Sequence, residues 1–213
     1  MTAPPTRTRI GATPLILIAA VAVAIGFFVG SRFLGAPPAP AMTTAVLYPA
    51  PREVPAFNLA AADGKPLTAA DWKGRWTLVF IGFTHCPDVC PNTLAVFRQV
   101  WNRLDAQGLT ARLRFAFISV DPERDNGTRL TDYVRYFHPD FEAATGSNDD
   151  LTRFTRSLGL VYTHVPDDKG GYSVDHSASV VIIDPDGRVI GLFRPPLEVE
   201  PIATDLATLA GKH

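Results

Sequence analysis

The sequence has 213 residues, of which 46% are hydrophobic and 19% are charged, and its formal net charge is −1. This length and composition fit one globular domain plus a short appendage. Without Arg7, Arg9 and Arg32, 17 of the 20 basic residues remain against all 21 acidic residues. So mildly acidic a domain does not resemble a nucleic-acid binder, which would need a basic face, and we expect no nucleic-acid partner.

The N-terminal region predicts a membrane anchor. No charged residue lies between Arg9 and Arg32, and residues 15–30 are almost wholly apolar. An uncharged span of this length can cross a bilayer core of about 30 Å as a helix. The alternative is a cleaved signal peptide, whose apolar core is usually only about 7–15 residues long. We therefore expect a cytoplasmic N-terminus over residues 1–12 and a transmembrane anchor over residues 13–33.

The charges beside this span indicate its orientation. Arg7 and Arg9 precede it and Arg32 follows it, which favours a cytoplasmic N-terminus. The chain has no Arg-rich and Ser-rich presequence before the span, which favours a bacterial protein over a mitochondrial precursor. The sequence therefore predicts a single-pass protein of a bacterial inner membrane, with its domain on the periplasmic side.

A stretch rich in proline and alanine follows the predicted anchor. Residues 34–53 have the composition of an extended, semi-rigid spacer. We therefore assign them as a linker and residues 54–213 as the globular domain.

The first long element of that domain is a buried strand. Residues 76–83 are almost wholly apolar, as expected for a strand with helices on both faces of its sheet. After position 91 the chain carries apolar side chains at three- and four-residue steps, the pattern of an amphipathic helix. These side chains are Leu94, Phe97, Trp101 and Leu104.

Between this strand and this helix lie Cys86 and Cys90, the only two cysteines of the chain. Their spacing is compatible with a disulfide, a redox dithiol or two ligands of a soft metal. A helix N-terminus favours thiolate over thiol and lowers the pKa of a nearby cysteine. Because proline suits a first helical turn, we place Pro91 near the helix start and expect residues 84–90 to form a loop that presents both sulfurs.

The remaining pattern predicts a thioredoxin-like α/β domain, with a central mixed sheet flanked by helices. A second buried strand completes a parallel βαβ unit, and further helices, a β-hairpin and a closing helix follow. These elements cover residues 114–120, 126–137, 147–159, 161–165, 178–183, 188–193 and 197–209. In this fold the first hairpin strand runs antiparallel beside the cysteine strand. That topology brings His176 to the cysteines.

Four motifs together resemble those of the Sco/SenC family. They are GFTHCPDVCP at residues 82–91, SVDPERD at 119–125, VDHS at 174–177 and IDPDG at 183–187. Members of this family are membrane-anchored copper proteins that assemble the dinuclear copper centre of cytochrome c oxidase. The resemblance covers about residues 54 to 210, and the predicted anchor and linker agree with it.

The resemblance implies that Cys86, Cys90 and His176 bind copper. Two thiolates and an imidazole suit this metal, as Cu(I) or Cu(II), whereas structural zinc normally has four protein ligands. Three ligands leave a position open for a metal that is handed on. Asp88 and Asp175 are candidates to orient His176 or to meet a partner.

Two functions follow from this site. The first is a copper metallochaperone that delivers copper to a cytochrome c oxidase subunit. This function also requires a copper donor and a thiol reductant, because the cysteines must be reduced before they bind metal.

The alternative is a thiol–disulfide oxidoreductase or redox sensor that acts on partner cysteines. Thioredoxin-type reductases use Cys-x-x-Cys and a cis-proline opposite the dithiol, where this chain instead has His176. We therefore favour the metallochaperone over an enzyme.

The other possible functions of the cysteine pair are disfavoured, and the other polar residues considered are interpreted as structural. A disulfide that closes so short a loop constrains the unfolded chain little. A peroxidase of the peroxiredoxin kind is disfavoured by a second cysteine four residues on and a histidine opposite. Residues 121–125 are interpreted as a cap and turn after a strand. The remaining histidines are interpreted as surface or hydrogen-bonded residues, and they are His85, His138, His164 and His213.

Overall fold

The computed structural model describes residues 12–34, 41–168 and 170–211. The chain divides into two compact units, residues 1–39 and residues 40–213, and the first contains helix α1 (Ala12–Leu34). No helix within the described ranges combines the length and the apolarity that crossing a membrane requires. The prediction that residues 13–33 span a membrane is therefore not confirmed. Residues 1–11 of the predicted cytoplasmic segment and 35–40 of the predicted linker lie outside the described residues.

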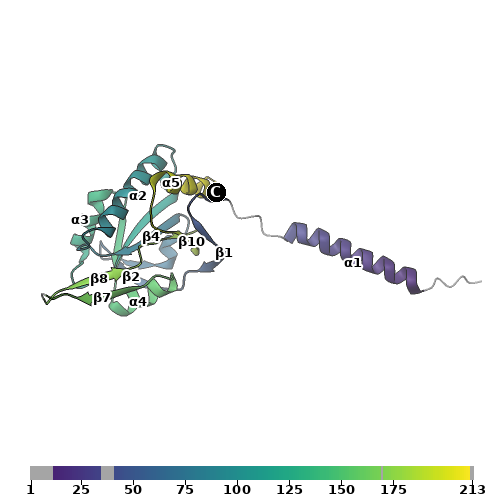
Figure 1. The fold of residues 1–213 in the computed structure, drawn as a ribbon, viewed down its shortest axis with the longest axis horizontal. Helices are drawn as coiled ribbons and strands as arrows, with labels where there is room; N and C mark the ends of the chain where they lie inside the picture. Colours follow the sequence, from purple (N-terminus) through teal and green to yellow (C-terminus); the bar gives the residue numbers. More distant parts are fainter. Residues whose placement is uncertain (1–11, 35–40, 169, 212–213) are drawn as a thin grey trace, which may run out of the picture. The chain divides into compact units, whose positions relative to one another are not determined.

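The domain is built on a mixed eight-stranded sheet, with a separate two-stranded sheet beside it. The strands of the large sheet are β1 (Val46–Glu53), β2 (Asn58–Ala61), β3 (Pro66–Thr68), β4 (Trp76–Gly82), β5 (Leu113–Ser119), β6 (Glu142–Thr145), β9 (Val180–Ile183) and β10 (Arg188–Phe193). Their spatial order is β1-β10-β9-β4-β5-β6-β2-β3. Figure 1 labels β1, β10, β4 and β2 of this sheet. The small sheet pairs β7 (Tyr162–Pro166) with β8 (Tyr172–His176).

The pairing confirms the predicted mixed α/β topology. Strands β4, β5 and β6 run parallel, and β9 runs antiparallel beside β4 with Val79 opposite Val181. The hairpin strand β9 therefore lies next to the strand that leads to the cysteines.

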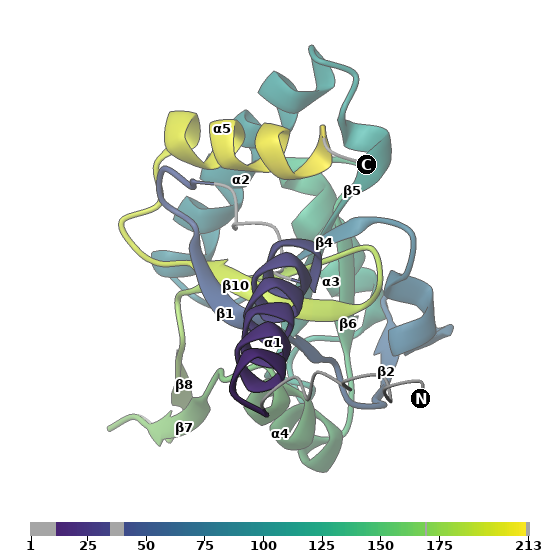
Figure 2. The same cartoon turned by 90° about the vertical axis from the view of Figure 1, so that its right-hand side faces the viewer.

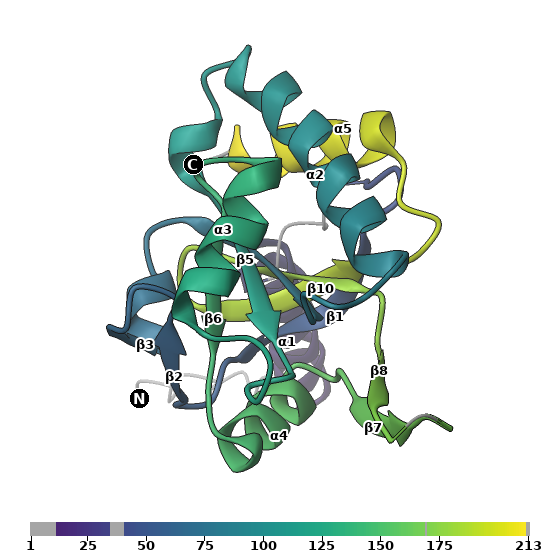
Figure 3. The ribbon, with the colours of Figure 1, turned by 90° about the vertical axis from the view of Figure 1, so that its left-hand side faces the viewer.

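Helices cover both faces of the large sheet. One face packs against α2 (Val89–Asp105), α3 (Gly127–Phe137) and α5 (Val199–Ala210), and the other against α4 (Asn148–Ser157) (Figure 3). Two short 3-10 helices, η1 (Ala69–Trp72) and η2 (Thr110–Arg112), precede β4 and β5.

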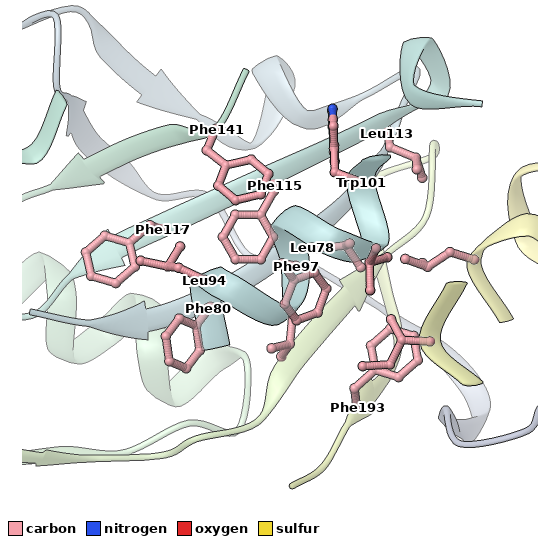
Figure 4. Packing of buried hydrophobic residues seen from close by; sticks show 14 of the residues in the cluster. Leu78, Phe80, Leu94, Phe97, Trp101, Leu113, Phe115, Phe117, Phe141 and Phe193 are labelled. Carbon is pink, nitrogen blue, oxygen red and sulfur yellow. The ribbon is translucent and has the colours of Figure 1, made fainter. Parts of the chain in front are cut away.

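The central strands are buried on both faces, as their apolar sequence predicts. Every residue of β4 and of β5 is buried. Phe80 and Phe117 belong to the cluster under α2, α3 and α5, in which Phe97 of α2 also packs (Figure 4). Val79 and Ile81 point to the other cluster, under α4. Full burial of each such side chain contributes about 1.5–3 kcal/mol, so the strand that carries the cysteine loop is rigidly held.

The domain begins earlier than predicted, because part of the proposed linker is a strand. Residues 46–53 form β1, an edge strand that pairs with β10 (Figure 2). Its register shifts between Leu47 and Arg52, where Pro49 and Pro51 lie. Edge strands and bulges are the places where a sheet tolerates proline, which lacks a donor for the ladder. The prolines of residues 46–53 therefore mark an irregular strand rather than a spacer.

A buried carboxylate fixes the residues just before β1. The side chain of Asp205 in α5 accepts hydrogen bonds from the backbone N–H groups of Thr43, Thr44 and Ala45, at 2.6, 2.8 and 2.7 Å. Asp205 is buried, and three donors compensate the desolvation of its charge. The domain is thus tied down from Thr43 onward.

Candidate metal centre

The two cysteines lie where β4 passes into α2. Cys86 is in the connecting turn, and its N–H group donates to the carbonyl of Phe83 at 3.2 Å. The helix begins at Val89, so Cys90 and Pro91 lie in its first turn. The predicted loop over residues 84–90 is therefore too long at its C-terminal end. Pro91 is tolerated there because the first N–H groups of a helix have no partner within the helix.

The helix start also sets the charge state of Cys86. The N–H group of Cys90 donates to Cys86 Sγ across 3.4 Å. Hydrogen bonds from the Cys90 side chain and from the backbone of Cys90 and Asp88 lower the pKa of Cys86 from 9.0 to about 4, although partial burial opposes this shift. The same bond to Cys86, together with burial, raises the pKa of the Cys90 thiol. At neutral pH the metal-free pair is thus one thiolate and one thiol.

Both cysteines are free, with Cys86 partly exposed and Cys90 buried. The ability of this pair to form a disulfide is therefore not confirmed by the structure and stays a prediction.

His176 is the third member of the site and ends strand β8. Its Nε2 atom lies 3.4 Å from Cys90 Sγ, and its ring meets the rings of Phe80 and Phe83 edge-on at centroid distances of 5.8 and 6.1 Å. On the other side of the ring, Nδ1 lies 3.1 Å from the carbonyl oxygen of Ser177. A carbonyl only accepts, so Nδ1 donates to it, and Nε2 is the ring nitrogen that faces the sulfurs.

The structure thus brings Cys86, Cys90 and His176 together. Their two sulfurs and one imidazole nitrogen all lie within 4.8 Å of one another. Soft sulfur donors with an imidazole form a donor set that suits copper, and three protein ligands leave a coordination position open.

Asp88 and Asp175 were predicted to orient His176 or to meet a partner, and neither side chain is hydrogen-bonded to the His176 ring. Asp88 accepts a hydrogen bond from the side-chain amide of Asn92. Asp175 is exposed, and its side chain has no hydrogen-bond partner among the described residues. The carbonyl of Ser177 orients the imidazole instead. Sequence reasoning missed this contact because a backbone acceptor leaves no residue-type signal.

Gly82 is a further residue of the site to which the sequence analysis assigned no role. A Cβ atom at this position would lie 2.5 Å from Cys90 Sγ and 2.8 Å from the ring of Phe117. No side chain fits there without displacing the sulfur. A glycine at the end of a buried strand is the signal that marks such a close approach.

Residues 121–125 form the turn that the sequence predicts, with Asp125 N donating to the carbonyl of Asp121 at 2.9 Å, and their aspartates also build a buried hydrogen-bond network. Asp125 accepts from Thr84 N at 2.8 Å, from Thr84 Oγ1 at 2.5 Å and from Ser119 Oγ at 2.6 Å. Asp121 accepts from Arg124 Nε at 2.5 Å and from the hydroxyl of Tyr172 at 2.7 Å. Both carboxylates are buried.

These two aspartates form a second group of close donor atoms with His85. Their oxygens already accept hydrogen bonds, and Asp121 is ion-paired with the guanidinium of Arg124. We therefore interpret the group as a structural network, which leaves Cys86, Cys90 and His176 as the candidate metal ligands.

Comparison with known proteins assigns the family. The SCO1/SenC family model matches residues 47–211 of the chain. The chain belongs to the SCO1/SenC family. This SCO1/SenC protein is 35% identical over 155 residues to a protein of Stutzerimonas stutzeri named as copper-binding, covering 73% of this chain and 76% of that one. It is 39% identical over 151 residues to the mitochondrial SCO2 homolog of Mus musculus, covering 70% of this chain but only 59% of that relative.

Solved structures of family members share its fold. The structure of Bradyrhizobium japonicum ScoI with copper bound matches with a TM-score of 0.67 and 33% identity, over 74% of this chain and 99% of that one. The crystal structure of Arabidopsis thaliana ScoI with copper bound matches with a TM-score of 0.67 and 28% identity, over 74% and 98% of the two chains. These matches confirm the predicted mixed α/β domain with its flanking helices.

Proposed function

We propose that this SCO1/SenC protein binds one copper ion, as Cu(I) or Cu(II), through Cys86, Cys90 and His176. The observation that carries the proposal is the convergence of these three donor atoms within 4.8 Å. The copper-bound structures of two relatives and the copper-binding name of a third support copper as the metal. Copper here is cargo rather than a permanent cofactor.

The proposed role is that of a metallochaperone that delivers copper to a cytochrome c oxidase subunit. Two properties of the site support transfer by ligand exchange. Three protein donors leave a position for a ligand of the acceptor protein. Cys86 is partly exposed whereas Cys90 is buried, so the acceptor ligand approaches from the side of Cys86. A copper donor and a thiol reductant complete the cycle, because only reduced cysteines bind the metal.

Thiol–disulfide exchange is the second candidate function, and the low pKa of Cys86 favours it. The Cys86 thiolate attacks a partner disulfide and displaces one partner sulfur as a thiolate. Cys90 then loses its proton and attacks the mixed disulfide, which forms the Cys86–Cys90 bond and releases the second partner thiolate. An external thiol reductant must restore the pair.

We also propose that the domain works on the periplasmic side of a bacterial inner membrane. Only sequence supports this location, through the uncharged stretch between Arg9 and Arg32. A fusion of alkaline phosphatase to the C-terminus of the full chain tests it. Activity supports a periplasmic domain, and an inactive but stable fusion contradicts it.

Metal analysis of the reduced full-length protein tests copper binding. The wild type should hold about one copper ion per chain, with charge-transfer bands of sulfur ligation. Cys86→Ser and Cys90→Ser should abolish those bands. His176→Ala should weaken binding while leaving a cysteine pair that still oxidises to a reducible bridge. His138→Ala, at the C-terminal end of α3 and away from both the cysteine loop and the β7–β8 hairpin, is the matched histidine control and should bind as the wild type does.

The same preparations separate the two functions. Unchanged copper content in His176→Ala would show that the three-ligand site is wrong. The copper-free wild type is also assayed for reduction of an oxidised partner peptide. Turnover that is lost in Cys86→Ser would support thiol–disulfide exchange. Without turnover, copper carriage would be the one of the two functions that remains.

A further inference from the structure

The two halves of the proposed copper site come from separate parts of the domain. The cysteines follow β4, whereas His176 ends the β7–β8 hairpin, which is not paired with the large sheet. An isolated two-stranded hairpin is only marginally stable in water. Something beyond the hairpin's own ladder must therefore hold His176 at the sulfurs.

One segment contacts both halves. Residues 119–125, here called the bridging segment, begin at the last residue of strand β5 and continue into the turn after it. We propose that the bridging segment positions His176 relative to Cys86 and Cys90, with Asp121 and Arg124 as positioning residues. This inference rests on the proposed copper site.

On the cysteine side the contact is made by Asp125. Its carboxylate accepts from both the backbone N–H group and the hydroxyl of Thr84, two residues before Cys86. Ser119 Oγ, at the end of β5, donates to the same carboxylate. A buried carboxylate is costly unless several donors satisfy it, so this arrangement resists displacement. Asp125 thereby fixes the start of the cysteine loop to the end of β5.

On the histidine side the contacts are made by Arg124 and Asp121. Arg124 Nη1 donates to the carbonyl of Tyr172 at 2.9 Å, and its guanidinium lies 3.9 Å from the centre of the Tyr172 ring. The hydroxyl of Tyr172 donates to Asp121, and Asp121 also accepts from Arg124 Nε. Tyr172 begins the strand that His176 ends. The three side chains thus hold one end of β8 by hydrogen bonds, an ion pair and a stacking contact.

Two further contacts reach the hairpin. The Arg124 guanidinium lies 5.7 Å from the ring of Phe83, which meets the His176 ring edge-on. Val174, between Tyr172 and His176, is buried in the core cluster under α4. Val174 contributes burial, which is not directional, whereas Arg124 and Asp121 contribute the directional contacts that fix the strand's orientation.

A substitution that weakens the contacts of the bridging segment should lower the fraction of molecules in which His176 lies beside the sulfurs, and with it the apparent copper affinity. The apparent affinity of a site falls with the fraction of molecules in the binding conformation. Lysine at position 124 keeps the charge but loses the guanidinium fork and its planar stacking. Hydrogen bonds to charged groups are strong enough that we expect Arg124→Lys to weaken Cu(I) binding about tenfold.

Two measurements on the full chain test the inference. The first is hydrogen exchange of residues 162–166 and 172–176 in the reduced, copper-free protein. Arg124→Lys should accelerate exchange there while strands β4 and β5 keep their protection. Arg153→Lys is the matched control, because Arg153 forms an exposed ion pair with Asp150 on α4. It should leave the hairpin unchanged.

The second is Cu(I) competition titration in two backgrounds. If Arg124 acts through His176, Arg124→Lys should weaken binding about tenfold in the wild type and have no further effect in His176→Ala. The Cu(II) spectrum of Arg124→Lys should shift toward that of His176→Ala. Equal losses in both backgrounds, or hairpin exchange equal to that of the wild type, would overturn the positioning role. If the wild type binds no copper, the proposed function fails, whereas hairpin exchange still decides whether the bridging segment holds the hairpin.

Discussion

The Sγ atom of Cys90 lies 3.4 Å from the Nε2 atom of His176, although 86 positions separate the two residues in the sequence. The antiparallel pairing of β4 with β9 places the chain after β4 and the chain before β9 at the same end of the sheet. The proposed copper site is therefore a property of the folded domain. In the unfolded chain only the cysteine pair would remain close.

Gly82→Ala should disrupt the copper site more than its small size suggests. The new Cβ atom would lie 2.5 Å from Cys90 Sγ, so the sulfur must move or the end of β4 must shift. We expect at least a tenfold loss of Cu(I) affinity, since a forced overpacking of this kind costs about 1–3 kcal/mol. Gly74→Ala is the control: its φ of 84° makes alanine strained, but open space surrounds it. That variant should lose stability and keep copper affinity.

Cys86 should be alkylated by iodoacetamide in the reduced, copper-free protein at pH values where ordinary thiols are inert. Only the thiolate reacts, and the pKa of Cys86 is lowered to about 4. The alkylation rate should therefore reach half its maximum near pH 4 and stay flat up to neutral pH, while Cys90 stays unmodified. In Cys90→Ala the Cys86 sulfur loses the side-chain donor at position 90, so the midpoint should move upward. A wild-type midpoint near pH 8 or 9 would contradict the assigned thiolate.

The same shift predicts a pH dependence of folding stability. The pKa of Cys86 is lower in the folded state than its ordinary value of 9.0, so between about pH 4 and pH 9 the unfolded chain binds more protons. This contribution to stability is complete above pH 9 and is lost as the pH falls toward 4. Urea unfolding of the reduced, copper-free protein at several pH values should show this slope. Cys86→Ser should have a smaller slope, and equal slopes would contradict the prediction.

Asp205→Ala should destabilise the domain without a direct effect on the metal site. The change removes three hydrogen bonds to a charged acceptor and leaves the N–H groups of Thr43, Thr44 and Ala45 without it. We expect a loss of about 3 kcal/mol in the free energy of unfolding, measured with urea. Thr208→Ala, on the same helix but exposed, is the control and should cost less than about 1 kcal/mol. Reduced copper affinity in folded Asp205→Ala would show an unexpected link to the site.

Much of the fold follows from local patterns in the sequence. The apolar run of β4 predicts a strand buried on both faces, and all its residues are buried. The sequence predicts a helix over residues 147–159, and α4 lies within that range, with Ser147 as its N-cap accepting from Asp150 N at 3.1 Å. These predictions succeed because burial and capping depend on residues close together in the chain.

The features that the sequence did not predict depend on partners far away in the chain or on backbone coordinates. Residues 46–53 were assigned to a linker from their prolines, yet pairing with β10 makes them a strand. The turn at residues 121–125 was predicted, but the buried network of Asp121 and Asp125 was not, because their partners Tyr172 and Thr84 lie far away in the sequence. The predicted proximity of Cys86, Cys90 and His176 agrees with the geometry. The predicted order of strands and helices already placed the first hairpin strand beside the strand that leads to the cysteines. The carbonyl of Ser177 was missed because its role depends on coordinates alone.

The three hydrogen bonds to Asp205 determine where mechanical force enters the domain. A pull on the chain ahead of Thr43 would first load these bonds and the ladder between β1 and β10. Strands β10 and β9 stand between that ladder and β4, which leads to the cysteines. Tension along the N-terminal segment would therefore be borne at the edge of the sheet before it strained the strand beside the ligands.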